Sequence, residues 1–248
     1  MFPNLWIFDS YTLLIFVGVI CCLLIYYIFA LKHNIKGKYL YDILINATLS
    51  VIVGFVFAVL FQSIFDAFKE NSENPPFAMT FYGGLIGGVL FFILFYKFYI
   101  QKKNENANFV KDILIIAPAC ITTAHAFGRI GCFLAGCCHG IETDSVLGMK
   151  FPGLEYNVYP TQLYEAIFLF ILSGILFVLA YKFQYFYTFT IYLASYGIFR
   201  FLIEFIRGDD RGAFLFSLSP AQWISIIAII ISILYFVLFK RYLKNKSI

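Results

Sequence analysis

The chain has 248 residues, of which 62% are hydrophobic and only 13% are charged. A soluble domain needs more polar surface than this to cover its core, so the composition excludes a soluble globular protein. The formal net charge of +4 is carried mostly beside apolar segments and gives no reason to expect a nucleic-acid partner. The bilayer is therefore the solvent that this composition indicates.

Seven apolar runs are long enough to cross a membrane as helices, which takes about 20 residues each. They predict an all-α, polytopic membrane protein with seven transmembrane helices, and we expect residues 1–248 to form a single integral-membrane domain. No Lys or Arg precedes Tyr11, so we expect no cleavable signal peptide. The runs lie at roughly 11–31, 42–65, 80–100, 110–127, 162–182, 187–206 and 221–239.

The distribution of basic residues predicts the orientation. Twelve of the eighteen fall in the loops and span ends of one side, and loops rich in Lys and Arg stay in the cytoplasm. We therefore expect the N-terminus outside and the C-terminus cytoplasmic. The twelve are Lys32, Lys36, Lys38, Lys97, Lys102, Lys103, Lys111, Lys182, Lys240, Arg241, Lys244 and Lys246.

Arginine is concentrated on the side predicted to be outside, which holds four of the five arginines. A guanidinium binds phosphate or carboxylate through a fork of hydrogen bonds, so this bias indicates an anion site. Internal Arg–Glu pairs are the alternative. Tyr196, Arg200, Glu204 and Arg207 recur at helical spacing and predict one polar stripe that faces the interior of the bundle or a wet cavity.

Two other polar or glycine-rich segments lie at span ends on this side. Gly83-Gly84-Leu85-Ile86-Gly87-Gly88 is typical of close helix packing in membranes, and it also lets a lipid head group approach the backbone. Gln162 and Glu165 lie in the first turn of the fifth span, where they either cap the helix or belong to the site.

The segment Gly128 to Gly140 is the richest in reactive side chains. It carries Arg129, three cysteines and a histidine among four glycines. Three interpretations of Cys132, Cys137 and Cys138 stay open: packing residues of a tight loop, thiols inside a catalytic site, or a soft-metal or redox site that includes His139.

These motifs together resemble the prolipoprotein diacylglyceryl transferase family. Four segments match its patterns in the same order, and the resemblance covers nearly the whole chain. They are Tyr82-Gly83-Gly84-Leu85-Ile86-Gly87, Gly128-Arg129-Ile130-Gly131-x-Phe133, Tyr159-Pro160-Thr161-Gln162-Leu163-Tyr164-Glu165, and Tyr196-Gly197-x-Phe199-Arg200-Phe201-x-x-Glu204-Phe205-x-Arg207.

The resemblance implies a transferase at the outer leaflet of the bacterial plasma membrane. Such an enzyme moves a diacylglyceryl group from phosphatidylglycerol to a cysteine thiol of a preprolipoprotein and releases glycerol phosphate. The implied partners are phosphatidylglycerol, the lipobox peptide of the preprolipoprotein and membrane lipid. No cofactor and no nucleic acid are expected.

Several positions depart from the family's patterns. The histidine that precedes the two glycines in the family is Tyr82 here, and a tyrosine with a pKa of about 10 is a poor base at neutral pH. The family's Asn and Glu positions are Cys132 and Cys137, and its His-Pro histidine is Tyr159. His125, which shares a helix face with Arg129 if the helix continues, and His139 are candidates to replace the missing base.

These observations give one set of candidate catalytic residues and one of substrate-binding residues, with no metal ligand assigned. The catalytic set is Arg129, Arg200, Tyr82, His125 and Glu204. The substrate-binding set is Tyr11, Gly83, Gly84, Gly128, Gly131, Cys132, Cys137, Gln162, Glu165, Tyr196 and Arg207. The alternative functions are a scaffold of this kind with another acceptor, or an extracytoplasmic thiol-redox or metal-binding membrane protein.

Overall fold

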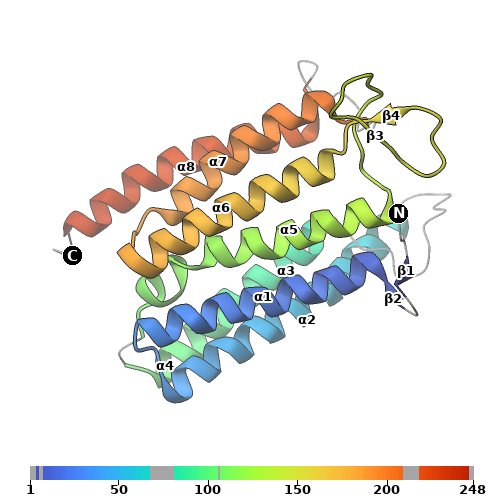
Figure 1. The fold of residues 1–248 in the computed structure, drawn as a ribbon. Helices are drawn as coiled ribbons and strands as arrows, with labels where there is room; N and C mark the ends of the chain where they lie inside the picture. The colour runs from blue at the N-terminus through green and yellow to red at the C-terminus, as the bar shows by residue number, and fades with distance from the viewer. Residues whose placement is uncertain (1–3, 6–7, 68–80, 106, 209–217, 246–248) are drawn as a thin grey trace. The chain divides into compact units, whose positions relative to one another are not determined.

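A computed structural model describes residues 4–5, 8–67, 81–105, 107–208 and 218–245 (Figure 1). The all-α prediction is confirmed, because the strands β1 (Asn4–Leu5), β2 (Phe8–Asp9), β3 (Met149–Lys150) and β4 (Asn157–Val158) form only short two-stranded pairs. Among the described residues, seven helices have the length and apolar composition needed to cross a membrane. They span Ser10–Lys32, Gly37–Ile64, Gly83–Lys103, Val110–Ala135, Thr161–Phe183, Thr188–Ile206 and Pro220–Arg241.

Contacts divide the chain into two compact units, residues 1–29 with 109–248 and residues 30–108. The prediction of a single integral-membrane domain stays a prediction. The helix α1 (Ser10–Lys32) runs from the first unit into the second.

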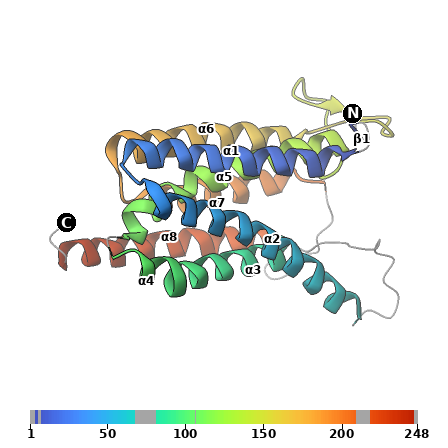
Figure 2. The same cartoon turned by 90° about the horizontal axis from the view of Figure 1, so that it is seen from below.

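The larger unit is built on α5 (Ala117–Ala135), α6 (Thr161–Phe183), α7 (Thr188–Ile203) and α8 (Pro220–Asn245). The pairs α5–α6, α6–α7 and α7–α8 are in contact, as Figure 1 shows. The helix α1 runs beside α5 in both Figure 1 and Figure 2. Gly18 allows the close approach, because a Cβ there would lie 3.1 Å from the carbonyl oxygen of Ala124. These helices bury a core that includes Ala119, Ala126, Leu169 and Leu176.

The smaller unit contains α2 (Gly37–Ala67), α3 (Phe81–Phe95), the π-helical turn η1 (Tyr96–Ile100) and α4 (Gln101–Lys103). The helices α2 and α3 pack closely through the glycines that the sequence singled out. A Cβ on Gly84 would lie 3.2 Å from the carbonyl oxygen of Gly54, and one on Gly83 would lie 2.6 Å from Phe61 Cβ. This bears out the interpretation as a packing motif, and substrate contact by Gly83 and Gly84 stays a prediction.

The fourth span differs from the sequence prediction, which ended it at residue 127. It begins with the π-helical turn η2 (Val110–Leu114), and α5 then continues to Ala135, so that Arg129 and Cys132 lie on a helix. Gly128 and Gly131 do not break it, because Gly131 packs against Tyr11 of α1 and Arg129 pairs with Glu165. Tertiary contacts thus override weak helix propensity here.

The helix α5 ends at Gly136, which adopts a left-handed conformation with φ of 76°. The segment between α5 and α6 then forms the β3–β4 hairpin and returns to Thr161. Three chain segments join at Gly140. Its amide donates to the carbonyl of Tyr159, the amide of Ile141 donates to the carbonyl of Ile206, and the amide of Gly208 donates to the carbonyl of His139. This junction holds the end of α5, the start of α6 and the end of α7 together.

Candidate active site

Glu165 is the centre of a buried polar cluster between α5, α6 and α7. Its side chain has no exposed surface, and its Oε2 lies 2.9 Å from Arg129 Nη2. Its Oε1 accepts a 2.8 Å hydrogen bond from the Tyr196 hydroxyl and lies 3.6 Å from His125 Nε2. His125 and Arg129 therefore share a face of α5, as the sequence predicted.

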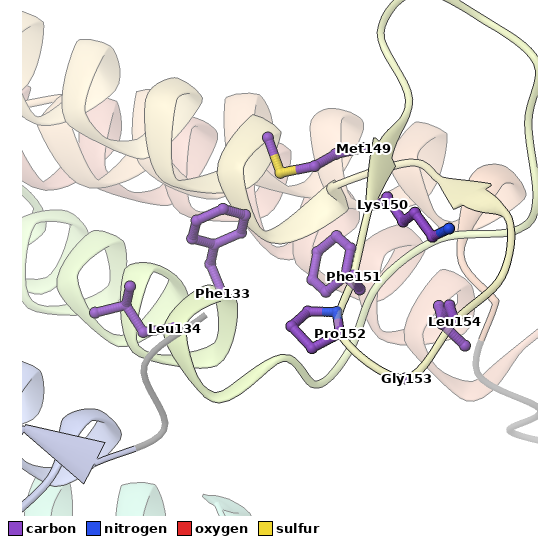
Figure 3. Close-up of a pocket in the computed structure, with 8 residues that line it drawn as sticks. All are labelled: Phe133, Leu134, Met149, Lys150, Phe151, Pro152, Gly153 and Leu154. Carbon is purple, nitrogen blue, oxygen red and sulfur yellow. The ribbon is translucent and has the colours of Figure 1, made fainter.

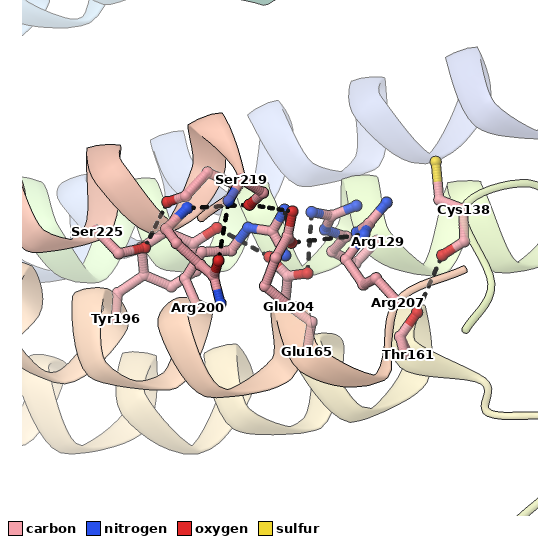
Figure 4. A network of polar contacts seen from close by, with 12 residues as sticks. Arg129, Cys138, Thr161, Glu165, Tyr196, Arg200, Glu204, Arg207, Ser219 and Ser225 are labelled. Atoms are coloured by element: carbon pink, nitrogen blue, oxygen red, sulfur yellow. Dashed lines mark hydrogen bonds and ion pairs between the residues drawn. The ribbon is translucent and has the colours of Figure 1, made fainter. Parts of the chain in front are cut away.

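Glu204 is the second acidic centre. Its Oε2 lies 2.8 Å from Arg200 Nη2 and 3.8 Å from Arg207 Nε, and its Oε1 accepts a 2.9 Å hydrogen bond from the Ser219 hydroxyl. The side chains of Arg200 and Arg207 are at most 9% exposed. Figure 4 shows the two acidic centres and their arginines in one network.

Among the described residues the cluster carries more positive than negative charge, because Arg129, Arg200 and Arg207 pair there with two carboxylates, Glu165 and Glu204. Arg129 Nε and Arg200 Nη1 are buried and have no hydrogen-bond partner among the described residues. A buried donor without a partner costs free energy, and a guanidinium satisfies this need best with an anionic oxygen. The internal Arg–Glu pairs weighed from the sequence therefore form. The anion site stays a prediction, and the two donors without partners favour it.

The polar stripe of α7 differs from the predicted continuous helix. The helix ends at Ile203, residues Glu204–Ile206 form the 3-10 turn η3, and Arg207 has extended backbone. Arg207 nevertheless faces Glu204, because its backbone pairs with Gly140. The prediction of a shared polar surface is confirmed, while the prediction of one helix through all four positions is wrong.

Gln162 and Thr161 hold the turn after α5. The Gln162 amide donates to the carbonyl of Cys137, and the Thr161 hydroxyl donates to the carbonyl of Cys138 over 3.0 Å. Gln162 is fully buried, and neither it nor Glu165 caps α6, whose N-cap residue Pro160 receives no side-chain hydrogen bond. The capping interpretation is therefore wrong, and a role of the two residues in a functional site stays a prediction.

The three cysteines after Arg129 come together at this turn. The sulfur atoms of Cys132, Cys137 and Cys138 lie within 4.8 Å of one another. Hydrogen bonds with the thiols of Cys132 and Cys137 lower the pKa of the Cys138 thiol, and the charges of Arg207 and Arg129 lower it further. The Nδ1 of His139 lies 3.1 Å from the carbonyl oxygen of Gly140, and His139 is not part of the thiol cluster.

An open pocket of about 650 Å³ lies beside the last turn of α5 (Figure 3). Its lining is mostly apolar, and the charged side chain among its lining residues belongs to Lys150. The lining residues are Phe133, Leu134, Met149, Lys150, Phe151, Pro152, Gly153 and Leu154. Phe151 is nearly fully buried and meets Phe133 edge to face, with ring centroids 5.8 Å apart.

Sequence reasoning missed the part that Ser219 and Gln222 play. The Ser219 hydroxyl accepts a hydrogen bond from the backbone N–H of Gln222. In return, the backbone N–H of Ser219 donates to the side-chain oxygen Oε1 of Gln222. This is a capping box with Pro220 in the first turn of α8. The pattern Ser-Pro-Ala-Gln predicts the cap, but nothing in it predicts that the same hydroxyl reaches Glu204.

The other predicted site residues fall into two groups. Tyr11 lies against Gly131, since a Cβ on Gly131 would be 3.0 Å from the Tyr11 ring, while Gly128 has open space beside its Cα. Tyr82, Gly83 and Gly84 belong to the smaller unit, and the side chain of Tyr82 lies outside what the structure describes.

Comparison with known proteins gives a consistent result. The family described as prolipoprotein diacylglyceryl transferase matches residues 5–238. A phosphatidylglycerol–prolipoprotein diacylglyceryl transferase of Clostridium tetani is 32% identical over 217 residues, which are 83% of this chain and 84% of the relative. A second enzyme of this name, transferase 2 of Clostridium perfringens, is 34% identical over 245 residues, with 92% and 89% covered.

A third relative of the same name, from Clostridioides difficile, is 33% identical over 221 residues, with 83% of this chain and 81% of the relative covered. The family match over residues 5–238 includes Arg129, Glu165, Arg200 and Glu204. The chain therefore belongs to the prolipoprotein diacylglyceryl transferase family.

Proposed function

We propose that this chain transfers the diacylglyceryl group of phosphatidylglycerol to a cysteine thiol of a prolipoprotein. The relatives' names state that those proteins are diacylglyceryl transferases that act on phosphatidylglycerol and prolipoprotein. The observation that carries the proposal to this chain is the buried cluster with excess positive charge and two unpartnered guanidinium donors, on Arg129 and Arg200. The seven apolar helices, together with the similarity to bacterial enzymes, indicate a multi-pass protein of the plasma membrane.

In this proposal Arg129 and Arg200 hold the phosphate of phosphatidylglycerol. The thiolate sulfur attacks the glyceryl carbon of the diacylglyceryl group, the bond from that carbon to the phosphate oxygen breaks, and glycerol phosphate leaves with the electron pair. Negative charge grows on the phosphate as it leaves. Preorganised guanidinium donors stabilise that charge more than they stabilise the intact lipid, which is the condition for catalysis.

His125 is the base that we propose for the acceptor thiol. It lies on the face of α5 that carries Arg129, is 25% exposed, and has its Nε2 within 3.6 Å of Glu165 Oε1. Burial disfavours the imidazolium that forms when the thiol proton is taken up, and the Glu165 carboxylate offsets part of this cost. Tyr82 remains the second candidate, from the sequence alone.

The remaining polar residues position this machinery. Glu165 and Glu204 fix the directions of Arg129 and Arg200, and Tyr196 donates to Glu165. Arg207 adds a third positive charge beside Glu204. Tyr11, Gly128, Gly131, Cys132, Cys137 and Gln162 complete the set that we propose to surround the lipid and the lipobox peptide at the outer leaflet.

A transfer assay tests the proposal with the purified full-length chain, phosphatidylglycerol vesicles and a lipobox peptide. The thioether product is measured by mass spectrometry together with released glycerol phosphate. We expect Arg129→Ala and Arg200→Ala to lower the rate by about 10²–10³, as is typical when one charge-stabilising donor is lost. Arg241→Ala, which removes an exposed arginine near the end of α8, is the matched control and should keep the wild-type rate.

The same assay separates the candidate bases. His125→Asn should lose about 10²–10⁴ in rate at neutral pH. Part of the loss should be recovered as the pH rises toward about 8.5, where a cysteine thiol ionises without help. A folded wild-type protein that makes no thioether, or an Arg129→Ala variant at full rate, would refute the proposed function. A full rate in His125→Asn would refute only the role of His125.

A further inference from the structure

Three thiols converge at the turn that ends α5. Cys132 lies in the last turn of the helix, and the left-handed residues Gly136, with φ of 76°, and Cys138, with φ of 64°, fold the following chain back toward it. The amide of Cys137 donates to the carbonyl of Cys132 over 3.1 Å, which fixes this reversal. All six cysteines of the chain are free thiols.

We propose that Cys132, Cys137 and Cys138 form a three-thiolate binding site for a thiophilic divalent cation, with Zn²⁺ as the ion that fits it best. Zinc–sulfur bonds of about 2.3 Å in tetrahedral geometry place the sulfur atoms about 3.8 Å apart. The sulfur atoms here lie within 4.8 Å of one another, so a shift of about 1 Å completes the geometry. Cys137 is exposed, and its side chain has room for that shift.

The surroundings suit the charge of such a site. Three thiolates around a divalent ion leave one negative charge in excess. Arg207 and Arg129 lie close enough to Cys138 to interact with it electrostatically, and they offset this charge. A zinc ion with three protein ligands keeps a fourth position for water or an incoming ligand.

His139, which the sequence placed among the candidate ligands, is not the fourth ligand in this arrangement. Its Nδ1 lies against the carbonyl of Gly140 and its ring lies beside Phe151, with centroids 5.4 Å apart. A disulfide is the competing use of the same thiols. It would join two of the three sulfur atoms and leave the third unused, and adjacent cysteines such as Cys137 and Cys138 bridge only with strain.

The site is also connected to the cluster around Glu165. The carbonyls of Cys137 and Cys138 accept hydrogen bonds from Gln162 and Thr161 in the first turn of α6. An ion that joins these cysteines to Cys132 therefore ties the end of α5, which carries Arg129, to the start of α6, which carries Glu165. We infer that the ion stabilises the turn on which the Arg129–Glu165 pair depends.

The test is a Co²⁺ titration of the purified full-length chain, reduced and freed of metal. Thiolate ligands give intense sulfur-to-cobalt charge-transfer absorption, and Zn²⁺ should abolish it by displacing the cobalt. We expect about one ion per chain, and a loss of affinity of about 100-fold or more in Cys132→Ser and in Cys138→Ser. Cys21→Ser, which removes a thiol of α1, is the matched control and should bind as the wild type does.

A second measurement needs no variant. Alkylation of the wild-type chain followed by peptide mass spectrometry should show Cys132, Cys137 and Cys138 protected by Zn²⁺ and reactive without it, while Cys21 is unaffected by the ion. Cobalt spectra without thiolate absorption, equal alkylation with and without Zn²⁺, or a Cys132–Cys137 disulfide in the native protein would overturn the proposal. None of these readouts uses the transfer reaction, so they leave the proposed function untouched.

Discussion

Glu165 illustrates how one side chain decides the geometry of several others. It has no exposed surface, and its two oxygens face Arg129 on one side and Tyr196 and His125 on the other. A buried carboxylate is tolerated only with such partners, and each partner in turn depends on it. The position of α6 relative to α5 is therefore linked to the direction of the Arg129 guanidinium.

Removal of the Glu165 charge should destabilise the protein. In Glu165→Gln, Arg129 keeps its buried positive charge without a carboxylate, and breaking a buried pair in this way costs about 3–5 kcal/mol. Thermal unfolding in detergent should show the loss as a lower midpoint. Glu155→Gln removes an exposed carboxylate and is the control, with an expected effect within about 0.5 kcal/mol. Equal midpoints for the two variants would contradict the structural role of Glu165.

At the scale of elements, the junction between α5, α6 and α7 depends on close backbone contact. Gly140 lies so near the carbonyl of Ile206 that a Cβ would clash with it, and that Cβ would also lie 2.8 Å from Tyr159 Cβ. Gly128, one turn before the thiols, has open space instead. Two glycines of the same motif therefore serve different purposes.

This difference gives a paired prediction. Gly140→Ala should lower the free energy of unfolding by about 1–3 kcal/mol, because the backbone of residue 206 must move. Gly128→Ala should leave stability unchanged or raise it by up to about 1 kcal/mol, because alanine favours the helix. If Gly128→Ala is stable but slow in the transfer assay, Gly128 contacts substrate. A wild-type rate would remove Gly128 from the substrate-binding set.

The helices could be predicted from the sequence and the site only in part. Apolar runs identified the seven spans, because a run of about 20 apolar residues is long enough to cross the bilayer and satisfies its backbone hydrogen bonds there as a helix. The end of α5 was missed, because Arg129 and Cys132 look like loop residues until Glu165 supplies a partner. Gln162 was read as either a cap or a site residue, because its bond to Cys137 joins residues 25 positions apart and only folding brings them together.

At the scale of the whole molecule, the orientation in the membrane remains a prediction. Four of the five arginines were assigned to the outer side, and eleven of the thirteen lysines to the inner side. We expect a fluorescent protein fused to the C-terminus to be fluorescent and alkaline phosphatase fused there to be inactive. The fluorescent protein folds in the cytoplasm, whereas alkaline phosphatase becomes active only outside it. An active phosphatase would reverse the orientation and place the arginine cluster on the cytoplasmic side.

The bonds from Thr161 and Gln162 to the carbonyls of Cys138 and Cys137 have a further consequence for the evolution of this protein. They close the intervening segment at its base, so its two ends stay together whatever its length. Doubling a closed loop costs only about 0.6 kcal/mol in chain entropy. The β3–β4 segment can therefore accept insertions and new surface residues in its exposed turns at little cost in chain entropy.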